Sequence, residues 1–349
     1  MQRRLLFFIL PLFLLASGCT RTVSLQVLQP AAFKVPEHLQ TLATVNRSRP
    51  ENKVGAVLEG LITGEAVGQD RSGARRATEG LSEALTRTPR FKVVFTSIEM
   101  QGKGPNQFPP ALPWPLVDSI CRSYGADGLA VIEKFDSNTT GSTSSVQRKK
   151  KDKEGVETTY LEYTAVLRTR VKLGWRLYDP KNRVILDEFD VWEERGWDEQ
   201  GLSEQEAQRR LPAQTFTVDE TAYYAGIKYG MRIAPTWINV SRSYYPKAKG
   251  TERLEADMAE ATRLARVDRW RDAARLWQPI AEDKSNPKAA AKACYNMALA
   301  SEWEGNLEVA RRWVQKAWEE YGSKPARTYL ATLDRRIVEQ QRVDEQMGN

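Results

Sequence analysis

Histidine and cysteine, the residues most used in metal sites and nucleophilic catalysis, are almost absent from this sequence. Its 349 residues include 1 histidine and 3 cysteines. The histidine, His38, has no second histidine or cysteine near it in the sequence, so zinc sites and Cys–His nucleophiles are not indicated. We interpret His38 as a structural or solvent-exposed residue, and we expect no metal and no cofactor.

The common catalytic motifs are missing as well. The sequence has no P-loop, no glycine-rich dinucleotide turn and no G-x-S-x-G elbow. The acidic pairs Asp187-Glu188 and Glu193-Glu194 lie in strand-like runs, where such pairs are typical of solvent-facing positions rather than of an acid–base couple. The sequence therefore predicts that the protein is not an enzyme, and nucleic acid is not expected among its partners.

No apolar run reaches the length of about 20 residues that a membrane-spanning helix requires. The run at residues 5–15 is shorter, and it follows Arg3 and Arg4 and precedes Ala16-Ser17-Gly18-Cys19. Charge, apolar core and small residues in this order are typical of a secretory signal peptide. We expect residues 1–18 to be removed.

The residues around the predicted cleavage site resemble the lipobox of bacterial lipoproteins. The resemblance rests on Leu15-Ala16-Ser17-Gly18-Cys19 and implies acylation of Cys19, which gives stable membrane attachment when two or more chains are added. Thr20-Arg21-Thr22 contains neither an Asp at the second position nor an acidic cluster, which favours an outer-membrane lipoprotein facing the periplasm. A secreted protein that happens to have an early cysteine is the alternative.

The remaining composition is that of an ordinary folded chain of about two domains, with 41% hydrophobic and 28% charged residues. Its formal net charge of +7 is compatible with anionic lipid, glycan or an acidic partner without requiring any of them. An oxidising compartment would allow Cys121 and Cys294 to pair, but they fall in predicted helices of different domains. We expect two independent buried thiols.

Residues 19–37 are predicted to form a lipidated extended tether, and residues 38–249 an α/β domain. The strand and helix patterns alternate, which predicts a mixed sheet covered by helices. Two long alternating runs separated by turn residues predict an antiparallel hairpin. The expected strands are residues 39–45, 53–61, 91–95, 128–135, 160–178, 183–197 and 237–246, and the expected helices are residues 70–88 (capped by Asp70), 114–124, 203–211 and 219–234.

Between these elements, residues 137–157 form a polar stretch rich in serine, threonine and lysine, with almost no apolar residue. We interpret it as a loop or as the tip of a long hairpin. Its basic residues are candidates for contact with an anionic surface or glycan, although a solvated tip is the simpler interpretation. The candidates are Arg148, Lys149, Lys150 and Lys151.

Residues 250–349 are predicted to be entirely helical. Two units align at an offset of 37 residues, close to the 34-residue period of tetratricopeptide repeats. The second unit resembles that repeat, with Asn296, Ala298, Gly305 and Leu307 at the expected spacing, whereas the first has Asp268 where glycine is usual. Two repeats and a final helix predict a small adaptor module rather than a long solenoid.

The whole chain resembles a group of uncharacterised Bacteroidota lipoproteins that pair an α/β domain with tetratricopeptide-like helices. The residues that carry this resemblance are Val45-Asn46-Arg47-Ser48, Pro235-Thr236-Trp237, Val240-Ser241-Arg242-Ser243-Tyr244-Tyr245 and Tyr295-Asn296-Met297-Ala298-Leu299-Ala300 with Glu302 and Gly305-Asn306-Leu307. The α/β part, especially residues 123–129, is similar to the domain shared by the curli-secretion lipoprotein and the Tol-system translocation protein. The polarity of residues 137–157 argues against a membrane-inserting hairpin of the curli kind.

These features favour a non-enzymatic, lipid-anchored envelope adaptor that binds a protein or peptide through its helical module. The candidate binding residues lie on the predicted inner helix of the second unit: Lys292, Tyr295, Asn296, Leu299, Glu302 and Trp303. The alternative for these residues is packing against the first domain. Competing functions are glycan or cell-wall binding through the basic stretch and the aromatic residues of the hairpin, and an oligomeric secretion component.

Overall fold

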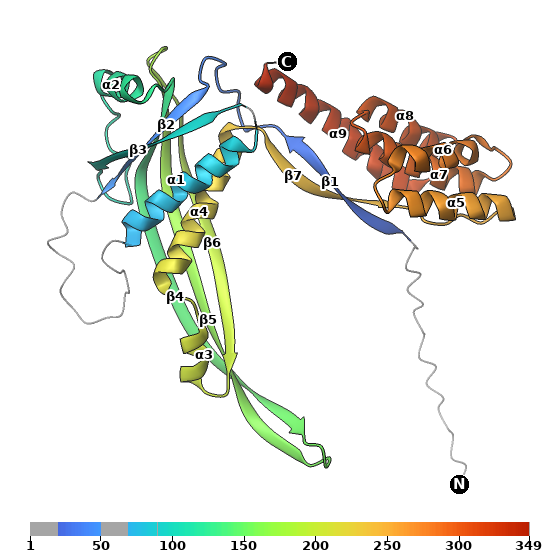
Figure 1. Ribbon diagram of the computed structural model, residues 1–349, viewed down its shortest axis with the longest axis horizontal. Coiled ribbons are helices and arrows are strands. Elements are labelled where there is room, and N and C mark those ends of the chain that lie inside the picture. The colour runs from blue at the N-terminus through green and yellow to red at the C-terminus, as the bar shows by residue number, and fades with distance from the viewer. Residues whose placement is uncertain (1–19, 50–68, 89, 349) are drawn as a thin grey trace, which may run out of the picture. The chain divides into compact units, whose positions relative to one another are not determined.

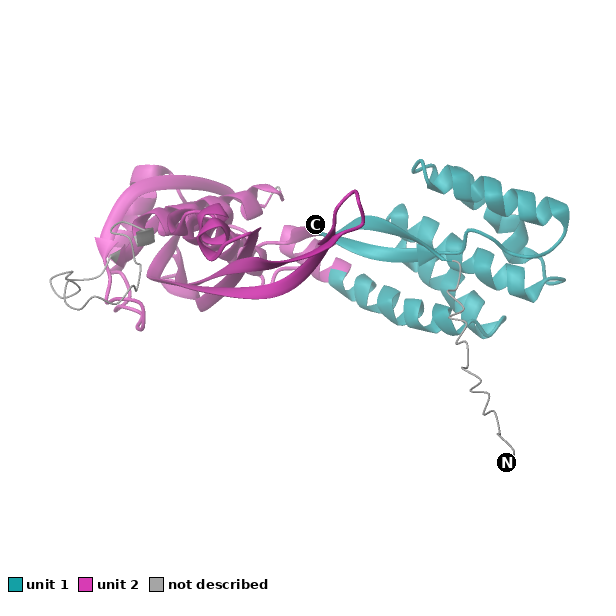
Figure 2. Cartoon of the chain, turned by 90° about the horizontal axis from the view of Figure 1, so that it is seen from below, with its two compact units in different colours: residues 1–27, 238–339 teal, residues 28–237, 340–349 magenta. Residues whose placement is uncertain are grey.

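The computed structural model describes residues 20–49, 69–88 and 90–348 (Figure 1). The chain forms two compact units (Figure 2). We call residues 28–237 and 340–348 the α/β unit, and residues 20–27 and 238–339 the helical unit. The predicted signal peptide, Cys19 and the strand predicted at residues 53–61 lie outside the described residues.

The α/β unit is built on a mixed sheet with the strand order β3-β2-β4-β5-β6. β2 pairs in parallel with β3 and β4, whereas β5 pairs antiparallel with both β4 and β6. The predicted mixed sheet and antiparallel hairpin are therefore confirmed. The strands are β2 (Thr41–Arg49), β3 (Lys92–Gln101), β4 (Gly128–Lys151), β5 (Glu157–Asp179) and β6 (Val184–Gly201).

Helices cover both faces of this sheet. α1 (Gln69–Thr86) and α4 (Gln214–Ile233) pack on the face that buries Ile132, and α2 (Trp114–Tyr124) packs on the face that buries Val131. α1 and α4 approach so closely that a Cβ on Gly226 would lie 1.9 Å from the carbonyl oxygen of Ala77. Asp70, predicted as the cap of the first helix, lies inside α1, and the short α3 (Glu204–Arg210) follows β6.

The polar stretch at residues 137–157 is mostly strand, so its prediction as a loop is wrong. β4 continues to Lys151 and pairs with β5 as far as Glu157, which leaves only residues 152–156 as a turn. The β5–β6 ladder ends at Tyr163 and Gly201, and beyond that point β4 and β5 form a two-stranded ribbon, which we call the arm (residues 146–162). The arm lacks apolar alternation because both of its faces are exposed to solvent. The alternative of a long hairpin tip is confirmed.

A β-bulge interrupts the alternation of β4 at Glu133. Ile132 pairs with Trp175 and Lys134 with Gly174, so Glu133 is an extra residue in β4. Ile132 faces the core under α1 and α4 before the bulge, and Phe135 faces it afterwards. Bulges re-aim side chains in this way.

The C-terminal region is helical, as predicted. Its helices are α5 (Glu252–Ala265), α6 (Trp270–Glu282), α7 (Pro287–Trp303), α8 (Leu307–Glu319) and α9 (Lys324–Met347), of which the last residues belong to the α/β unit. The turns that follow α5 and α7 are equivalent, because Asp268 (φ 58°) and Gly305 (φ 79°) both adopt the left-handed conformation. No helix in the described residues has the length and apolar character needed to cross a membrane.

Two predicted connections differ in the structure. Residues 20–37 are more than an extended tether, because Arg21–Gln29 forms β1, which pairs with β7 (Thr236–Tyr244). β7, predicted to close the α/β domain, does not join the five-stranded sheet. Leu25 and Tyr244 are instead buried in the core of the helical unit. The boundary between the units therefore falls at residues 237/238 rather than 249/250.

Candidate functional site

The predicted partner-binding residues lie on α7, where they bind a segment of the same chain. Asn296 is fully buried, and its side-chain amide recognises a backbone. Its Nδ2 donates to the carbonyl oxygen of Tyr245 (2.7 Å), and its Oδ1 accepts from the amide of Tyr245 (2.8 Å). Asn296 therefore bonds both the donor and the acceptor of one extended backbone residue, as it could bond a residue of a bound peptide.

A buried ion pair holds the same segment one helical turn and a half further along α7. The carboxylate of Glu302 accepts from Arg242 Nη2 (2.8 Å) and Nε (2.9 Å). The hydroxyl of Tyr329 donates to Glu302 at 2.5 Å, and burial together with this carboxylate raises the pKa of Tyr329 well above its ordinary value. Both charges are thus paired and hydrogen-bonded, as burial requires.

Further contacts continue along the segment after β7. The hydroxyl of Thr262 donates to the carbonyl oxygen of Pro246 (2.9 Å), Lys292 Nζ to that of Lys247 (3.3 Å), and Asn286 Nδ2 to that of Lys249 (2.8 Å). We call residues 242–249 the groove segment. Of the other candidates, Tyr295 packs against Tyr245. Leu299 is buried in the core, and Trp303 stacks on Trp270.

In the structure these six residues therefore pack within the chain, as the alternative interpretation expects. Their partner is the groove segment of the helical unit rather than the α/β unit, because β7 belongs with the helices. The run at residues 237–246 predicts a strand correctly, but periodicity contains no information about which sheet that strand joins.

An exposed aromatic surface lies on β6 and α4. Trp192 exposes 60% of its surface and Phe189 39%. Lys228 lies 5.2 Å from the centroid of the Trp192 ring, and Arg232 lies 3.7 Å from that of Phe189. Lys228 and Arg232 also pair with carboxylates, at 2.7 Å from Glu193 and 2.9 Å from Asp187.

The same surface extends to Tyr224, whose ring centroid lies 3.9 Å from Arg195. It includes a hollow of about 350 Å³ between Ala32, β6 and α4. We call Phe189, Trp192, Arg195, Tyr224, Lys228 and Arg232 the β6–α4 surface. The paired cations hold the aromatic rings in place at the edge of the sheet and leave them open to solvent.

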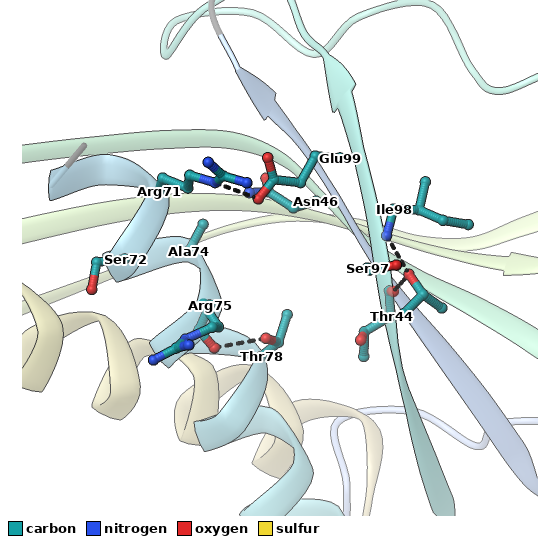
Figure 3. Close-up of a pocket in the computed structure, with 11 residues that line it drawn as sticks. Thr44, Asn46, Arg71, Ser72, Ala74, Arg75, Thr78, Ser97, Ile98 and Glu99 are labelled. Carbon is teal, nitrogen blue, oxygen red and sulfur yellow. Dashed lines mark hydrogen bonds and ion pairs between the residues drawn. The ribbon is translucent and has the colours of Figure 1, made fainter. Parts of the chain in front are cut away.

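A polar groove of about 520 Å³ lies between the middle of the parallel strands β2 and β3 and the first half of α1 (Figure 3). Arg71 Nε lies 2.7 Å from Glu99, and the hydroxyl of Thr96 donates to the carbonyl oxygen of Thr44 (2.6 Å). The lining suits a polar ligand, but it brings together no nucleophile and base.

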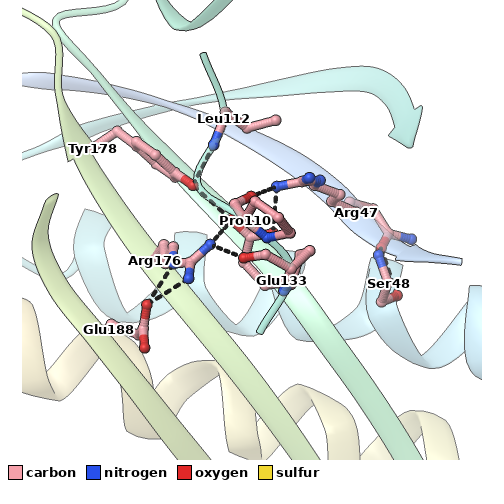
Figure 4. A network of polar contacts seen from close by, with 10 residues as sticks. Arg47, Ser48, Pro110, Leu112, Glu133, Arg176, Tyr178 and Glu188 are labelled. Carbon is pink, nitrogen blue, oxygen red and sulfur yellow. Dashed lines mark hydrogen bonds and ion pairs between the residues drawn. The ribbon is translucent and has the colours of Figure 1, made fainter. Parts of the chain in front are cut away.

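The bulge residue Glu133 is the centre of a buried network (Figure 4). Its carboxylate accepts from the hydroxyl of Tyr178 (2.8 Å) and from Arg47 (3.2 Å) and Arg176 (3.4 Å). Burial raises the pKa of Glu133, although its three partners act to lower it. Burial and the carboxylate of Glu133 raise the pKa of Tyr178 to about 12. The same partners bond the backbone of residues 109–112, so the network anchors this loop on the sheet.

The predicted basic residues extend along one strand of the arm. Arg148 pairs with Glu162 (3.0 Å) and Lys149 with Glu157 (2.5 Å). Lys150 and Lys151 form no ion pair with a described residue. The structure therefore leaves two of the four cations free for an anionic surface.

Histidine and the two thiols have structural environments. His38 Nε2 lies 2.9 Å from the buried Asp179, as expected for a structural histidine. Cys121 and Cys294 are buried and unpaired, which confirms two independent thiols. Within residues 20–49, 69–88 and 90–348, no cluster of three potential metal ligands occurs.

Comparison with family models matches residues 39–245 to a family described as "Domain of unknown function (DUF8603)". The chain belongs to this family. A second model, "Domain of unknown function (DUF6340)", matches residues 259–338. The DUF8603 region ends at Tyr245 and so includes β7, although β7 packs in the helical unit.

No curated protein matches the chain. Among solved structures, a neuraminyllactose-binding haemagglutinin homologue from Helicobacter pylori is 12% identical and has a TM-score of 0.27. The match covers 57% of this chain and 89% of the other. A likeness this low supports no inference about function.

Proposed function

We propose that this DUF8603 protein is a lipid-anchored, non-enzymatic adaptor of the cell envelope that binds a protein partner. Attachment through Cys19 to the outer membrane, facing the periplasm, rests on the N-terminal sequence. The inner face of the helical unit is occupied by the groove segment, so it is not open to a partner. The partner surface is therefore assigned to the β6–α4 surface.

The exposure of Trp192 carries this assignment. Trp192, with 60% of its surface in water, lines the same hollow as the part-exposed Phe189, and contiguous exposed apolar surface of this kind marks interaction sites. Tryptophan, tyrosine and arginine dominate the energetic centres of protein interfaces, and the β6–α4 surface combines all three. The ion pairs of Lys228 and Arg232 fix the rings beforehand, which lowers the entropy lost on binding.

The test is a crosslinking pull-down from envelope membranes with wild type, Trp192→Ala and Phe95→Ala. Phe95 is the control because it exposes 50% of its surface on β3, the opposite edge strand. Loss of an interface tryptophan costs about 2 kcal/mol or more, so we expect Trp192→Ala to weaken capture by about thirtyfold. Phe95→Ala is expected to capture as wild type does. Equal capture by all three contradicts the proposed surface.

Glycan or cell-wall binding is the competing function, and the unpaired lysines of the arm favour it. Replacing Lys149, Lys150 and Lys151 with glutamate separates the two functions. Lost binding to purified cell-wall glycan, with protein capture unchanged, supports glycan binding. Fractionation of Cys19→Ala tests the anchor separately, since a lipoprotein loses its membrane fraction without that thiol.

A further inference from the structure

The anchor proposed at Cys19 would leave almost no free tether. β1 begins at Arg21, and two extended residues span at most about 7 Å. β1 enters the helical unit at once, because Leu25 and Val27 are buried in its core. An acylated Cys19 would therefore hold the first residues of β1, and the surface beside them, close to the lipid headgroups.

A hollow of about 310 Å³ lies beside this end of β1. It is lined by Arg21 and Thr22 from β1, by Tyr244 from β7, and by the turn between α5 and α6, including Arg266 and Asp268. Val267 in the same turn exposes 62% of its surface. The hollow therefore combines charged walls with an exposed apolar tip.

The charges of this hollow lack partners in the described part of the chain. Arg263 and Arg269, which flank the turn, pair with Glu260 and Asp272. In contrast, no ion pair with a described residue involves Arg21, Arg266 or Asp268. Two guanidinium groups and one carboxylate are thus available to a ligand.

Asp268 occupies its position at a cost in conformational energy. The equivalent turn after α7 has Gly305 in the same left-handed conformation, which glycine adopts more readily than aspartate does. A strained residue at a lined hollow points to a role for its side chain. The group that Asp268 adds to the turn is a carboxylate, whose negative charge suits a cationic group of a ligand.

We propose that this hollow binds the headgroup of a phosphatidylethanolamine molecule in the membrane that holds the anchor. Arg21 and Arg266 bind the phosphate by charge-assisted hydrogen bonds, Asp268 binds the ammonium group, and Val267 enters the acyl boundary. This assignment rests on the proposed anchor at Cys19. It fixes which end of the helical unit faces the bilayer.

The experiment uses residues 19–349 with Cys19 coupled to a maleimide lipid in vesicles. Cys121 and Cys294 do not compete, because burial raises their pKa to about 11 and about 12. Amide hydrogen exchange of residues 265–270 is compared in phosphatidylcholine vesicles with and without phosphatidylethanolamine. Choline cannot donate a hydrogen bond to Asp268, so phosphatidylethanolamine is expected to slow exchange about tenfold, as at roughly ten times Kd.

Three variants define the outcome. Arg266→Glu removes the slowing, whereas Arg253→Glu, at the other end of α5 and 93% exposed, retains it. Asp268→Gly relieves the strained turn, so it folds at least as well as wild type, yet it loses the preference for phosphatidylethanolamine. Absence of slowing in wild type, or persistence of slowing in Arg266→Glu, overturns the site. Persistence of the preference in Asp268→Gly overturns the assignment of the ammonium group.

Failure of the anchor is distinguishable from failure of this site. Acylation of Cys19 is measured in cells by labelling with a fatty acid. The vesicle assay supplies its own lipid at Cys19, so its result does not depend on that acylation.

Discussion

The inner face of α7 and the β6–α4 surface contain similar residues but differ in what covers them. On α7, Asn296 and Glu302 are buried, and their side chains are bonded to the groove segment and to Tyr329. On β6 and α4, Lys228 and Arg232 also have carboxylate partners, yet the rings that they stack on remain in water. The contrast teaches that residue type describes what a surface can bind, whereas burial decides whether it is available.

The largest effect is expected at the buried ion pair. Glu302→Ala leaves the largely buried Arg242 charged and without its carboxylate, which costs about 3–5 kcal/mol. Chemical denaturation of the helical unit measures this loss. Glu304→Ala is the control, because its pair with Arg271 is exposed and contributes below about 1 kcal/mol. Equal losses for the two variants would mean that the groove segment is not held by Glu302.

An intermediate effect is expected at the amide that recognises Tyr245. Asn296→Ala leaves the amide and carbonyl groups of Tyr245 without partners, at a cost of roughly 2–3 kcal/mol. The denaturation midpoint of this variant is compared with that of Gln278→Ala, whose exposed amide bonds Glu282. If Asn296→Ala is as stable as wild type, the amide of Asn296 does not hold the groove segment, and the contrast with the open surface is lost.

The smallest effect on stability is expected at the open surface. Trp192→Ala changes the free energy of unfolding by less than about 0.5 kcal/mol, because exposed substitutions disturb little packing. Trp270→Ala in the core of the helical unit is the matched contrast and costs about 3–5 kcal/mol. A loss above about 1 kcal/mol for Trp192→Ala would identify Trp192 as a packing residue and remove it from the partner surface.

Much of the α/β unit was predictable from periodicity. Residues 160–178 and 183–197 alternate because one face packs on helices, whereas residues 128–132 form a continuous apolar run because both faces are covered. The helices of the C-terminal region repeat their apolar residues at helical spacing. The outer part of β4, residues 137–151, is not visible as a strand in the sequence, because its few inward-facing residues are serine and threonine and the rest are exposed to solvent. The bulge at Glu133 was missed because an extra residue becomes visible only against the partner strand.

The candidate site was predictable in its chemistry but not in its occupant. The sequence predicts Asn296 and Glu302 as candidate partner-binding residues, and in the structure they bind a backbone amide, a carbonyl and an arginine of the same chain. The β6–α4 surface was identified only as aromatic residues of a hairpin. Its use depends on α4, which brings Lys228 and Arg232 beside β6 from more than 30 positions away in the sequence.

Local patterns alone were sufficient for the two classes of structure, the order of most elements and the pair of independent thiols. These depend on spacing along the chain, where each residue acts through its near neighbours. Tertiary packing decided that β1 and β7 belong to the helices, that the groove of α7 is filled by residues 242–249, and that Trp192 is left in water. Burial is a property of segments that meet across long separations, so it emerges only when the chain is folded.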